Sequence, residues 1–370
     1  MPSFPSRSVA IVGAGPLGLE AALAALDHGL DPQVYEQGEV GAHALAWGHV
    51  RLFTPWRMNV GVHARAHLEA AGWTPPAAEE LPTGLELVER YLRPLAALPE
   101  LRERVHPFTQ VVAAGLPGQR PGEGDPRARP FRLLLRDPGG RESLAHAVAL
   151  LDLTGVYANP DRAGAGGMPA LDEEYLGPEF AYHLEDVLGT DRERYAGRRT
   201  VVIGEGTFAA TTVTALARLA DEAPGTRVLW LTRALGGGLF PDAERDPLPA
   251  RRELHRRARE LAGGGHAAVT HVGAAEVEAF ESAPETRRYR VRLEAAGEPR
   301  AEEADRVVVN AGFRPDDRLR RGLDGDEPRF LSLGREAQGG EPGLLLESAH
   351  RRVREAVGRL AAGLAAGPAA

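Results

Sequence analysis

The stretch "SVAIVGAGPLGLEAALAALDHG", residues 8–29, decides the fold. Residues 8–13 are apolar and predict a short buried strand, and helical periodicity then runs from Pro16 to about His28, where Gly29 ends the helix. The next segment, "DPQVYEQ" at 31–37, predicts a second strand. A strand, a helix and a strand in this order form a β-α-β unit, so we expect an α/β protein with a parallel sheet.

The turn inside this unit has the pattern G-x-G-x-x-G. Gly13 permits the tight turn, Gly15 lets a pyrophosphate approach the backbone, and Gly18 lets the helix pack closely on the strand. Free N–H groups at the start of the helix favour an anion there. Glu36 closes the second strand, where a carboxylate can accept hydrogen bonds from a ribose. The residues expected to bind this dinucleotide are Gly13, Gly15, Pro16, Leu17, Gly18, Glu36 and Gln37.

A second stretch of the same kind, "TVVIGEGTFAATTVTALARLA", occupies residues 200–220 and is followed by the strand pattern "TRVLWLTR" at 226–233. Its turn reads G-x-G-x-x-A, and its second strand is followed by Arg233 instead of an acid. A carboxylate would repel a 2′-phosphate, whereas a guanidinium binds one with two hydrogen bonds, so NADPH is favoured over NADH. The residues expected to bind this nucleotide are Gly204, Gly206, Thr207, Phe208, Ala209 and Arg233.

Two similar segments lie on either side of the second unit. "LDLTGVYANP" at 151–160 and "VVNAGFRPD" at 308–316 each run from an apolar strand through a glycine and an aromatic residue to a proline. The simplest interpretation is that a second nucleotide domain is inserted into the first, with these segments as the two crossovers. We therefore expect two Rossmann-like, three-layer domains.

Composition narrows the function classes. The 370 residues are 43% hydrophobic, enough for two cored domains, and the net charge of −8 argues against a nucleic-acid partner. The arginines of "RRELHRRARE", 251–260, alternate with acids and predict a solvated helix face. The N-terminal residues lack the apolar stretch of a signal peptide, and no uncharged run approaches the ~20 residues of a membrane span, so a cytoplasmic protein without a membrane partner is expected.

Two residue types are missing. The chain has no cysteine, which excludes a protein disulfide, a zinc-thiolate site and a redox C-x-x-C motif, and it has no lysine, which excludes a lysine Schiff base. His63 and His67 have metal-like spacing on a predicted helix, but no third ligand or H-E-x-x-H motif accompanies them, so no metal is expected. No G-x-S-x-G motif supports a hydrolase.

The two glycine motifs, "LDLTGVYANP", "FAYHLEDV" at 180–187, "LTR" and "NAGFRPD" resemble the two-dinucleotide-binding-domain flavoproteins. Within that superfamily the chain looks most like the flavin-containing (class B) and N-hydroxylating monooxygenases. The resemblance implies FAD in a domain of residues 1–165 and 310–370, and NADPH in an inserted domain of residues 166–309. It adds to the cofactor-binding residues Val111, Thr154, Gly155, Gly312 and Gly334.

The chain departs from the family pattern in several places. The family's "GD" near the C-terminus is replaced by 331–349, with Gly334 as the nearest match, and its "GGxW" is loosened to "GAHALAW", Gly41 to Trp47. Phe208 stands where the family has a small residue, which places bulk beside the second pyrophosphate turn.

The resemblance also implies a reaction. Hydride passes from NADPH to FAD, and a flavin C4a-hydroperoxide then oxygenates a nitrogen, sulfur or carbonyl centre of a small substrate. The partners would be that substrate and molecular oxygen, and a homodimer is an expectation by analogy only. Two alternatives stay open: an FAD-dependent oxidase, dehydrogenase or NADPH-flavin reductase without oxygen insertion, and a degenerate flavoprotein with a binding role.

The segment "AWGHVRLFTPWRMN", 46–59, follows the FAD ribose strand and is the expected lining of the flavin ring. Trp47 and Trp56 are expected to cover ring faces. Thr54 and Asn59 are candidates to hydrogen-bond flavin atoms or the peroxide. Arg51 or Arg57 is a candidate to hold negative charge on reduced flavin or on a substrate carboxylate, and His49 is a candidate acid/base group.

Overall fold

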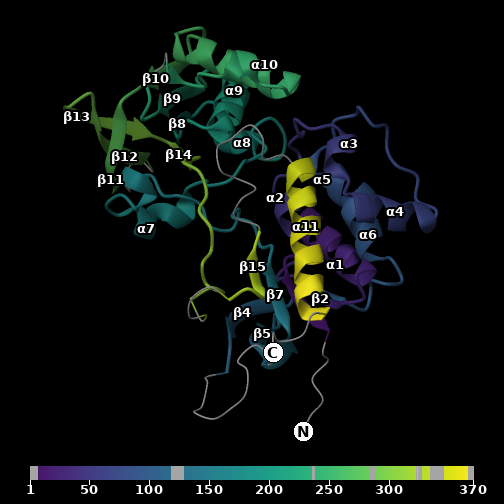
Figure 1. Cartoon of the computed structure of the whole chain (residues 1–370). Helices are drawn as coiled ribbons and strands as arrows, with labels where there is room; N and C mark the ends of the chain where they lie inside the picture. The colour runs from purple at the N-terminus through teal and green to yellow at the C-terminus, as the bar shows by residue number, and fades with distance from the viewer. Residues whose placement is uncertain are drawn as a thin grey trace. The chain divides into compact units, whose positions relative to one another are not determined.

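The structure is a computed structural model that describes residues 7–117, 129–235, 238–283, 285, 288–321, 323, 327–333 and 346–365 (Figure 1). Gly334, a predicted flavin-binding residue, lies outside these ranges. The chain divides into two compact units: Met1–Ala158 with Pro315–Ala370, called unit 1, and Asn159–Arg314, called unit 2. These divisions lie a few residues from the boundaries expected at 165 and 309.

Unit 1 is built on a five-stranded parallel sheet with the order β15-β7-β1-β2-β3, accompanied by a three-stranded antiparallel sheet, β4-β5-β6. The strands are β1 (Ser8–Val12), β2 (Asp31–Tyr35), β3 (Val105–His106), β4 (Gln110–Gly115), β5 (Phe131–Arg136), β6 (Glu142–Ala147), β7 (Ala149–Asp152) and β15 (Phe330–Ser332). The helices are α1 (Pro16–Asp27), α2 (Ala42–Ala46), α3 (Trp56–Asn59), α4 (Val62–Ala70), α5 (Gly84–Leu87), α6 (Arg93–Ala96) and α11 (Leu346–Ala365).

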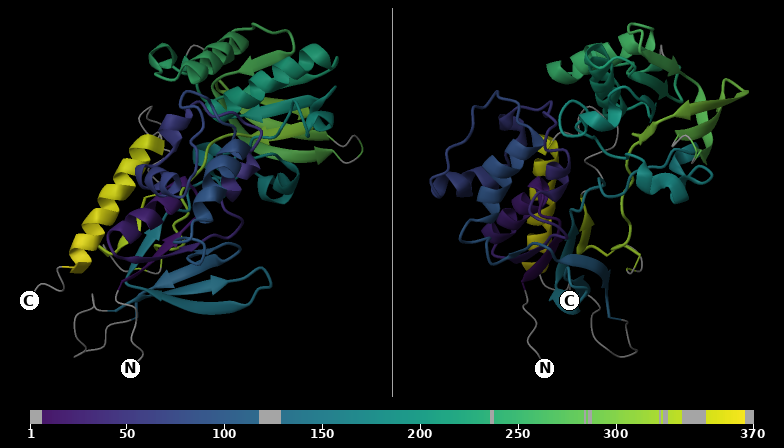
Figure 2. Two further views of the ribbon diagram at one scale, coloured as in Figure 1. Left: turned by 90° about the vertical axis from the view of Figure 1, so that its right-hand side faces the viewer. Right: turned by 180° about the vertical axis from the view of Figure 1, so that it is seen from behind.

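Strand β1 shows why unit 1 has three layers. Val9 and Ile11 point into a core shared with α1, α4 and α11, whereas Ala10 and Val12 point into a core shared with the antiparallel sheet. Because side chains alternate across a strand, one apolar strand can supply both cores. Figure 2 shows α11 running beside α1, and the apolar face of α11, which includes Val353 and Val357, joins the first core.

The helical region after α4 contains a proline without breaking. This region consists of α5, a π turn (Val88–Leu92) and α6, with Pro94 near the start of α6. A proline has no N–H to donate and its ring crowds the preceding turn. The widened turn directly before Pro94 accommodates both effects, so the chain stays helical.

Unit 2 repeats the same plan. A four-stranded parallel sheet, β10-β9-β8-β14, is accompanied by a three-stranded antiparallel sheet, β11-β12-β13. The strands are β8 (Arg199–Ile203), β9 (Arg227–Leu231), β10 (Val269–Val272), β11 (Ala275–Ala283), β12 (Arg288–Ala295), β13 (Glu298–Ala304) and β14 (Arg306–Val309). The helices are α7 (Glu173–Leu176), α8 (Arg192–Tyr195), α9 (Thr207–Glu222) and α10 (Pro249–Ala262), and short 3₁₀ turns lie at Ala165–Gly167, Gly177–Glu179 and Ala243–Arg245.

Strand β8 divides its side chains as β1 does. Val201 and Ile203 join a core with the antiparallel sheet, and Val202 joins the core under α9 and α10. The predicted α/β fold with two Rossmann-like, three-layer units is therefore confirmed. Helix α10 carries its arginines outward and pairs them with acids, as its charge pattern predicted, for instance Arg256 with Glu253.

The two similar crossover segments have the same position in both units. β7 is parallel to β1 and β14 is parallel to β8, so each segment follows the strand next to the first strand of its unit. The chain enters and leaves unit 2 at adjacent points, because Asp161 N donates to Gly312 O at 2.9 Å and Arg314 N donates to Asn159 O at 2.9 Å. The repeated sequence pattern thus reflects a repeated structural element.

Candidate functional site

The first glycine loop joins β1 to α1 in the conformation that its glycines require. Gly13 has φ +109°, and a Cβ there would lie 2.6 Å from the carbonyl oxygen of Leu153 in the crossover segment. A Cβ on Gly18 would lie 1.9 Å from Gly13 O, so the helix packs against the loop only with glycine there. Gly15 is the N-cap of α1, has no side-chain cap, and leaves open space where its Cβ would stand.

Glu36 fastens this loop to the end of β2. Its Oε2 accepts from Ala14 N at 2.9 Å and its Oε1 accepts from Gly38 N at 3.0 Å. Each carboxylate oxygen has a further lone pair that can accept a ribose hydroxyl. Together with the uncapped N–H groups of α1, this arrangement fits the pyrophosphate and ribose of a dinucleotide. The neighbouring Gln37 is exposed, and Leu17 is buried beneath the loop.

The second glycine loop repeats this geometry between β8 and α9. Gly204 has φ +140°, and a Cβ there would lie 2.1 Å from Asn310 O of the second crossover. Gly206 is the uncapped N-cap of α9 and leaves open space at its Cβ position, as Gly15 does. Thr207 Oγ1 lies 3.0 Å from His255 Nε2, and Ala209 is fully buried. This loop therefore also fits a dinucleotide pyrophosphate.

Phe208 contacts an aromatic residue of the second crossover. Its ring meets Phe313 of the second crossover edge-on, with centroids 5.2 Å apart and an interplanar angle of 67°. The bulk that the sequence places beside the pyrophosphate turn is thus half-buried in a contact within unit 2. The resulting aromatic pair holds the start of α9 against the crossover.

Arg233 follows β9 as predicted and is held by a carboxylate that the sequence analysis did not consider. Its Nη2 donates to Glu205 Oε1 at 2.8 Å, and Ala234 N donates to Glu205 Oε2 at 2.9 Å. Glu205 is the residue between the first two glycines of the second loop. The charged residue inside the G-x-G pattern was the signal that could have indicated this pair.

Each crossover has a glycine with positive φ and a carboxylate nearby. After β7, Thr154 donates from its N and its Oγ1 to Asp152 Oδ1, at 3.2 and 2.7 Å, and Gly155 has φ +70°. Burial raises the pKa of Asp152, although the bonds from Thr154 oppose that shift. After β14, Gly312 has φ +124° and lies beside Asp161. Val111 is buried in β4, in the core between the two sheets of unit 1.

Within the predicted flavin-lining segment, Thr54 and Asn59 bind one another. Thr54 Oγ1 donates to Asn59 Oδ1 at 2.8 Å, and Asn59 Nδ2 donates to the carbonyl oxygens of Thr54 and Pro55 at 2.9 and 3.0 Å. Asn59 is fully buried, so its amide closes the turn around α3. Trp56, expected to cover a ring face, is instead a core residue with 1% exposure.

The other candidates of this segment are partly or fully exposed. Trp47 is half-buried and packs over Gly84, where a Cβ would lie 2.6 Å from its ring. Arg51 is exposed and donates to Leu81 O, and His49 is exposed in the turn before it. The structure therefore does not gather the predicted flavin-lining side chains around one point.

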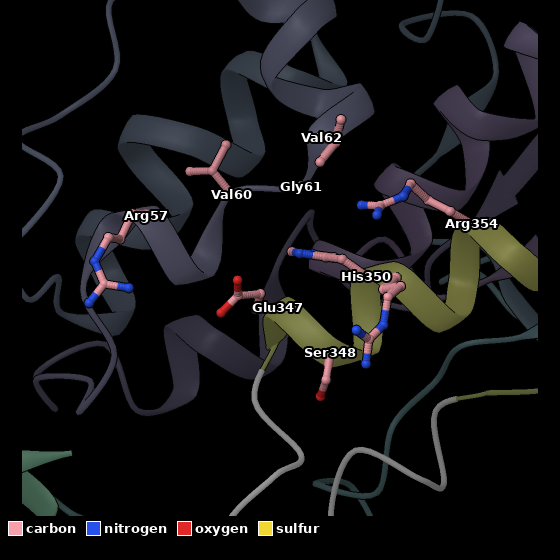
Figure 3. A pocket seen from close by; sticks show the side chains of 9 residues that line it. Arg57, Val60, Gly61, Val62, Glu347, Ser348, His350 and Arg354 are labelled. Atoms are coloured by element: carbon pink, nitrogen blue, oxygen red, sulfur yellow. The ribbon is translucent and has the colours of Figure 1, made fainter. Parts of the chain in front are cut away.

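Arg57 belongs to a pocket of about 420 Å³ in unit 1 that the sequence analysis missed (Figure 3). One wall is the segment from Arg57 to Val62, and the other is the first three turns of α11. The lining residues are Arg57, Val60, Gly61, Val62, Glu347, Ser348, His350, Arg351 and Arg354. Arg57 donates to Glu79 Oε1 at 2.8 Å and Arg354 lies 4.0 Å from Glu20 Oε1, so Arg351 is the main cation that the pocket offers to an anion. The signal in the sequence was the basic run of the C-terminal helix.

His350 is the buried polar group of this pocket. It is 2% exposed, and its Nε2 has no hydrogen-bond partner among the described residues. Figure 3 shows its ring turned toward the space between Gly61 and Glu347. Burial, assisted by the charge of Arg354, lowers the pKa of His350 to about 4, so the imidazole is neutral near pH 7. A ligand that hydrogen-bonds to this atom would relieve the cost of an unpaired buried group.

Glu20 on α1 fixes the wall of the pocket. Its carboxylate is fully buried and accepts from the backbone N–H groups of His63 and Ala64, at 3.1 and 2.9 Å. These N–H groups lie in the first turn of α4 and have no acceptor within the helix. Arg354 Nη1 lies 4.0 Å from its Oε1. A Cβ on Gly61 would lie 2.1 Å from Glu20 Oε2, so glycine is required at that point of the wall.

His63 and His67 contact carboxylates. His67 lies 2.7 Å from Glu100 and 3.1 Å from Asp27, and His63 also pairs with Asp27. In the described residues no three histidine or acidic side chains are grouped so that they could hold a metal ion. Across those same residues, no helix has the length and apolar character needed to cross a lipid bilayer.

The paired glycine loops and the two three-layer units define the class of fold, which consists of two Rossmann-like units, one inserted into the other. No protein-family model matches the chain, and no curated protein sequence matches it. The structure is similar to that of bacillithiol disulfide reductase Bdr (YpdA) from Bacillus cereus, with 18% identity, a TM-score of 0.70, and coverage of 96% of this chain and 99% of the other.

Two hydroxylases are similar to a comparable degree. Ornithine N-hydroxylase KtzI from Kutzneria sp. 744, solved with reduced FAD, NADP⁺ and L-ornithine, has 18% identity and a TM-score of 0.64, covering 96% of this chain and 99% of that one. Ornithine hydroxylase PvdA from Pseudomonas aeruginosa has 17% identity and a TM-score of 0.66, covering 97% and 99%. Reductases and hydroxylases thus share this fold, which by itself does not separate their reactions.

Proposed function

We propose that this protein is an FAD-dependent oxidoreductase that takes its electrons from NADPH. One observation carries the proposal: each unit has an uncapped helix start behind a glycine whose Cβ position is open, at Gly15 and at Gly206. Unit 1 would hold FAD through Gly13, Gly15, Gly18 and Glu36. Unit 2 would hold NADPH through Gly204, Gly206 and Arg233. Bound flavin supplies hydride acceptance from nicotinamide and subsequent electron transfer to oxygen or a small molecule.

Within this class we propose a monooxygenase acting on a small substrate at a nitrogen, sulfur or carbonyl centre. The absence of cysteine supports this choice, because electrons delivered to the flavin have no protein disulfide to reduce. The likeness to two ornithine hydroxylases supports it as well. The second alternative is an oxidase, dehydrogenase or NADPH-flavin reductase on the same scaffold. The similarity to a disulfide reductase supports this alternative. A binding protein without turnover is the third alternative.

The decisive experiment is anaerobic reduction of the purified protein loaded with FAD. We expect NADPH to bleach the flavin absorbance, which would exclude the binding role; a flavin that NADPH does not bleach would contradict the proposed electron donor. Admitting ¹⁸O₂ in the presence of amines, thioethers or ketones then separates the two catalytic alternatives. A monooxygenase gives a labelled product and releases less peroxide per NADPH. Stoichiometric peroxide with all three substrate types would favour the oxidase.

Several predicted catalytic residues retain a proposed role. We propose that Thr54 and Asn59 position the loop around α3 through their mutual bonds, which leaves Arg57 facing the pocket. His49 is an exposed acid/base candidate whose role depends on a bound substrate. Arg57 would bind an acidic group of the substrate, as the sequence predicted, together with Arg351 across the pocket.

The pocket assignment has its own test. We expect Arg351→Gln to raise the KM for an acidic substrate about tenfold with little change in kcat, because the lost contact serves binding alone. Arg359→Gln is the matched control, since this exposed arginine of the same helix does not line the pocket. Loss of flavin in Arg351→Gln, with the control unaffected, would show that the pocket serves FAD instead.

A further inference from the structure

In both units a carboxylate connects the glycine loop to the segment after the second strand, but it comes from opposite sides. In unit 1, Glu36 follows β2 and reaches back to the N–H of Ala14, the residue between the first two glycines. In unit 2, Glu205 is itself the residue between the first two glycines and reaches forward to the N–H of Ala234, after β9. The same place next to the loop therefore holds a carboxylate in both units.

In unit 2 this carboxylate also holds the cation that was predicted to select the nucleotide. Glu205 Oε1 accepts from Arg233 Nη2 at 2.8 Å, and the side chains are 31% and 62% exposed. Both residues line a pocket of about 150 Å³ together with Gly204 and Leu231, so the pair borders the cavity beside the glycine loop. The ion pair is part of that cavity wall.

We propose that Glu205 determines the nucleotide preference of unit 2 by opposing the 2′-phosphate of NADPH and accepting a ribose hydroxyl of NADH. This inference rests on the proposed function of unit 2. It predicts that the preference of the wild-type protein for NADPH over NADH is weaker than Arg233 alone would give, because Glu205 opposes the same phosphate.

The opposition follows from the way Glu205 is anchored. A phosphate that binds the other N–H groups of Arg233 comes close to Glu205, because Nη2 of the same guanidinium donates to Oε1. Glu205 is held in place, because its Oε2 accepts from Ala234 N. The phosphate then lies within a few ångströms of a fixed carboxylate, and like charges at such distances repel.

An unphosphorylated ribose meets a different arrangement. Its hydroxyls can donate to Glu205 while they accept from Arg233, so the ion pair serves as one donor and one acceptor for the diol. No charge has to be removed from the pair in this mode. The carboxylate therefore has the role that Glu36 is proposed to have in unit 1, although it is supplied by the loop and not by the strand end.

The test uses the FAD-loaded protein and the unreactive nucleotides NADP⁺ and NAD⁺, with dissociation constants measured by calorimetry. We expect Glu205→Gln to change the ratio of the two affinities about tenfold in favour of NADP⁺. Arg233→Ala should shift the ratio in the opposite direction. Glu276→Gln is the matched control, because Glu276 lines the same pocket but bonds neither to Arg233 nor to Ala234, and it should change the ratio less than threefold.

The outcomes separate this inference from the proposed function. A Glu205→Gln ratio within threefold of wild type, with both nucleotides still bound, overturns the role of Glu205 alone. A wild-type protein that binds neither nucleotide overturns the proposed role of unit 2. If Glu205→Gln does not fold, Glu205→Ser removes the charge with a smaller side chain. The same tenfold change in the ratio of the two affinities is then expected for Glu205→Ser.

Discussion

Phe208 is the residue whose sequence and structural interpretations differ most. The family that the sequence resembles has a small residue in its place, whereas here the ring packs edge-on against Phe313. We expect Phe208→Ala to lower the free energy of unfolding by about 1–2 kcal/mol, less than for a fully buried phenylalanine, since the ring is half-buried. Nucleotide affinity should change less than threefold. Chemical denaturation and NADP⁺ titration measure the two effects.

A tenfold gain in NADP⁺ affinity in Phe208→Ala would contradict this account, because it would mean that the ring obstructs the pyrophosphate. Val291→Ala serves as the control, since Val291 is fully buried in β12, in the core between the parallel and antiparallel sheets of the same unit. That variant should lose stability and leave nucleotide binding unchanged.

At this scale the sequence predicts best where the backbone itself demands a residue type. Gly13 and Gly204 have positive φ and lie close to carbonyl oxygens, so each position requires glycine. The G-x-G motifs that contain them can therefore be recognised from the local sequence alone. Glu20 and Glu205 act on atoms distant in sequence or on a neighbour across the sheet, and local patterns do not contain those partners. Their roles therefore required the structure.

Between elements, an ionic cluster connects α1, α4 and the segment after α6. Burial lowers the pKa of His67, but bonds to Glu100 and Asp27 outweigh it and raise the pKa overall. Burial raises the pKa of Asp27 and of Glu100, but hydrogen bonds outweigh it and lower both: the bonds of His63 and His67 for Asp27, and those of the Glu100 backbone N–H and of His67 for Glu100. His67 therefore stabilises the fold below its unfolded pKa and loses that effect as the pH rises through its raised pKa. The two acids lose theirs as the pH falls through their lowered pKa values.

The cluster should accordingly stabilise most at about pH 5–6, between the ordinary pKa values of the acids and of histidine. We expect His67→Asn to lower the free energy of unfolding by at most about 1 kcal/mol in that range, since the groups are partly exposed, and by less at pH 8.5. Thermal unfolding from pH 4 to 9 gives the difference curve. His28→Asn is the control. A loss of unfolding free energy in His67→Asn that becomes larger as the pH rises would contradict the predicted pH dependence.

Elements were predicted well where one periodicity dominated. The strand and helix of both glycine units and the strand that leads into each crossover all follow their apolar pattern. The pocket between the segment Arg57–Val62 and α11 was not predicted, because it joins residues almost three hundred positions apart. The cores that bring these segments together form only when the parallel sheet is assembled.

For the whole molecule, the two units should lose their nucleotides independently. A methyl group at Gly15 or Gly206 meets no protein atom within 4 Å, so alanine there leaves the fold intact but stands where the pyrophosphate would lie. We expect Gly15→Ala to reduce flavin content at least tenfold. Gly206→Ala should keep its flavin and weaken NADP⁺ binding at least tenfold. Absorbance after purification and calorimetry provide the readouts, and Gly206→Ala protein purified without flavin would refute this division of roles.

The insertion of unit 2 also has a consequence for the order of folding during synthesis. Every residue of unit 2 precedes Pro315, whereas unit 1 needs β15 at the edge of its sheet and α11 against α1. While the ribosome is still producing the last segment, unit 2 is complete and the apolar face of α1 is uncovered. Nascent chains released after residue 333 should therefore contain a protease-resistant unit 2 and a protease-sensitive unit 1, because α11 is not yet in place against α1.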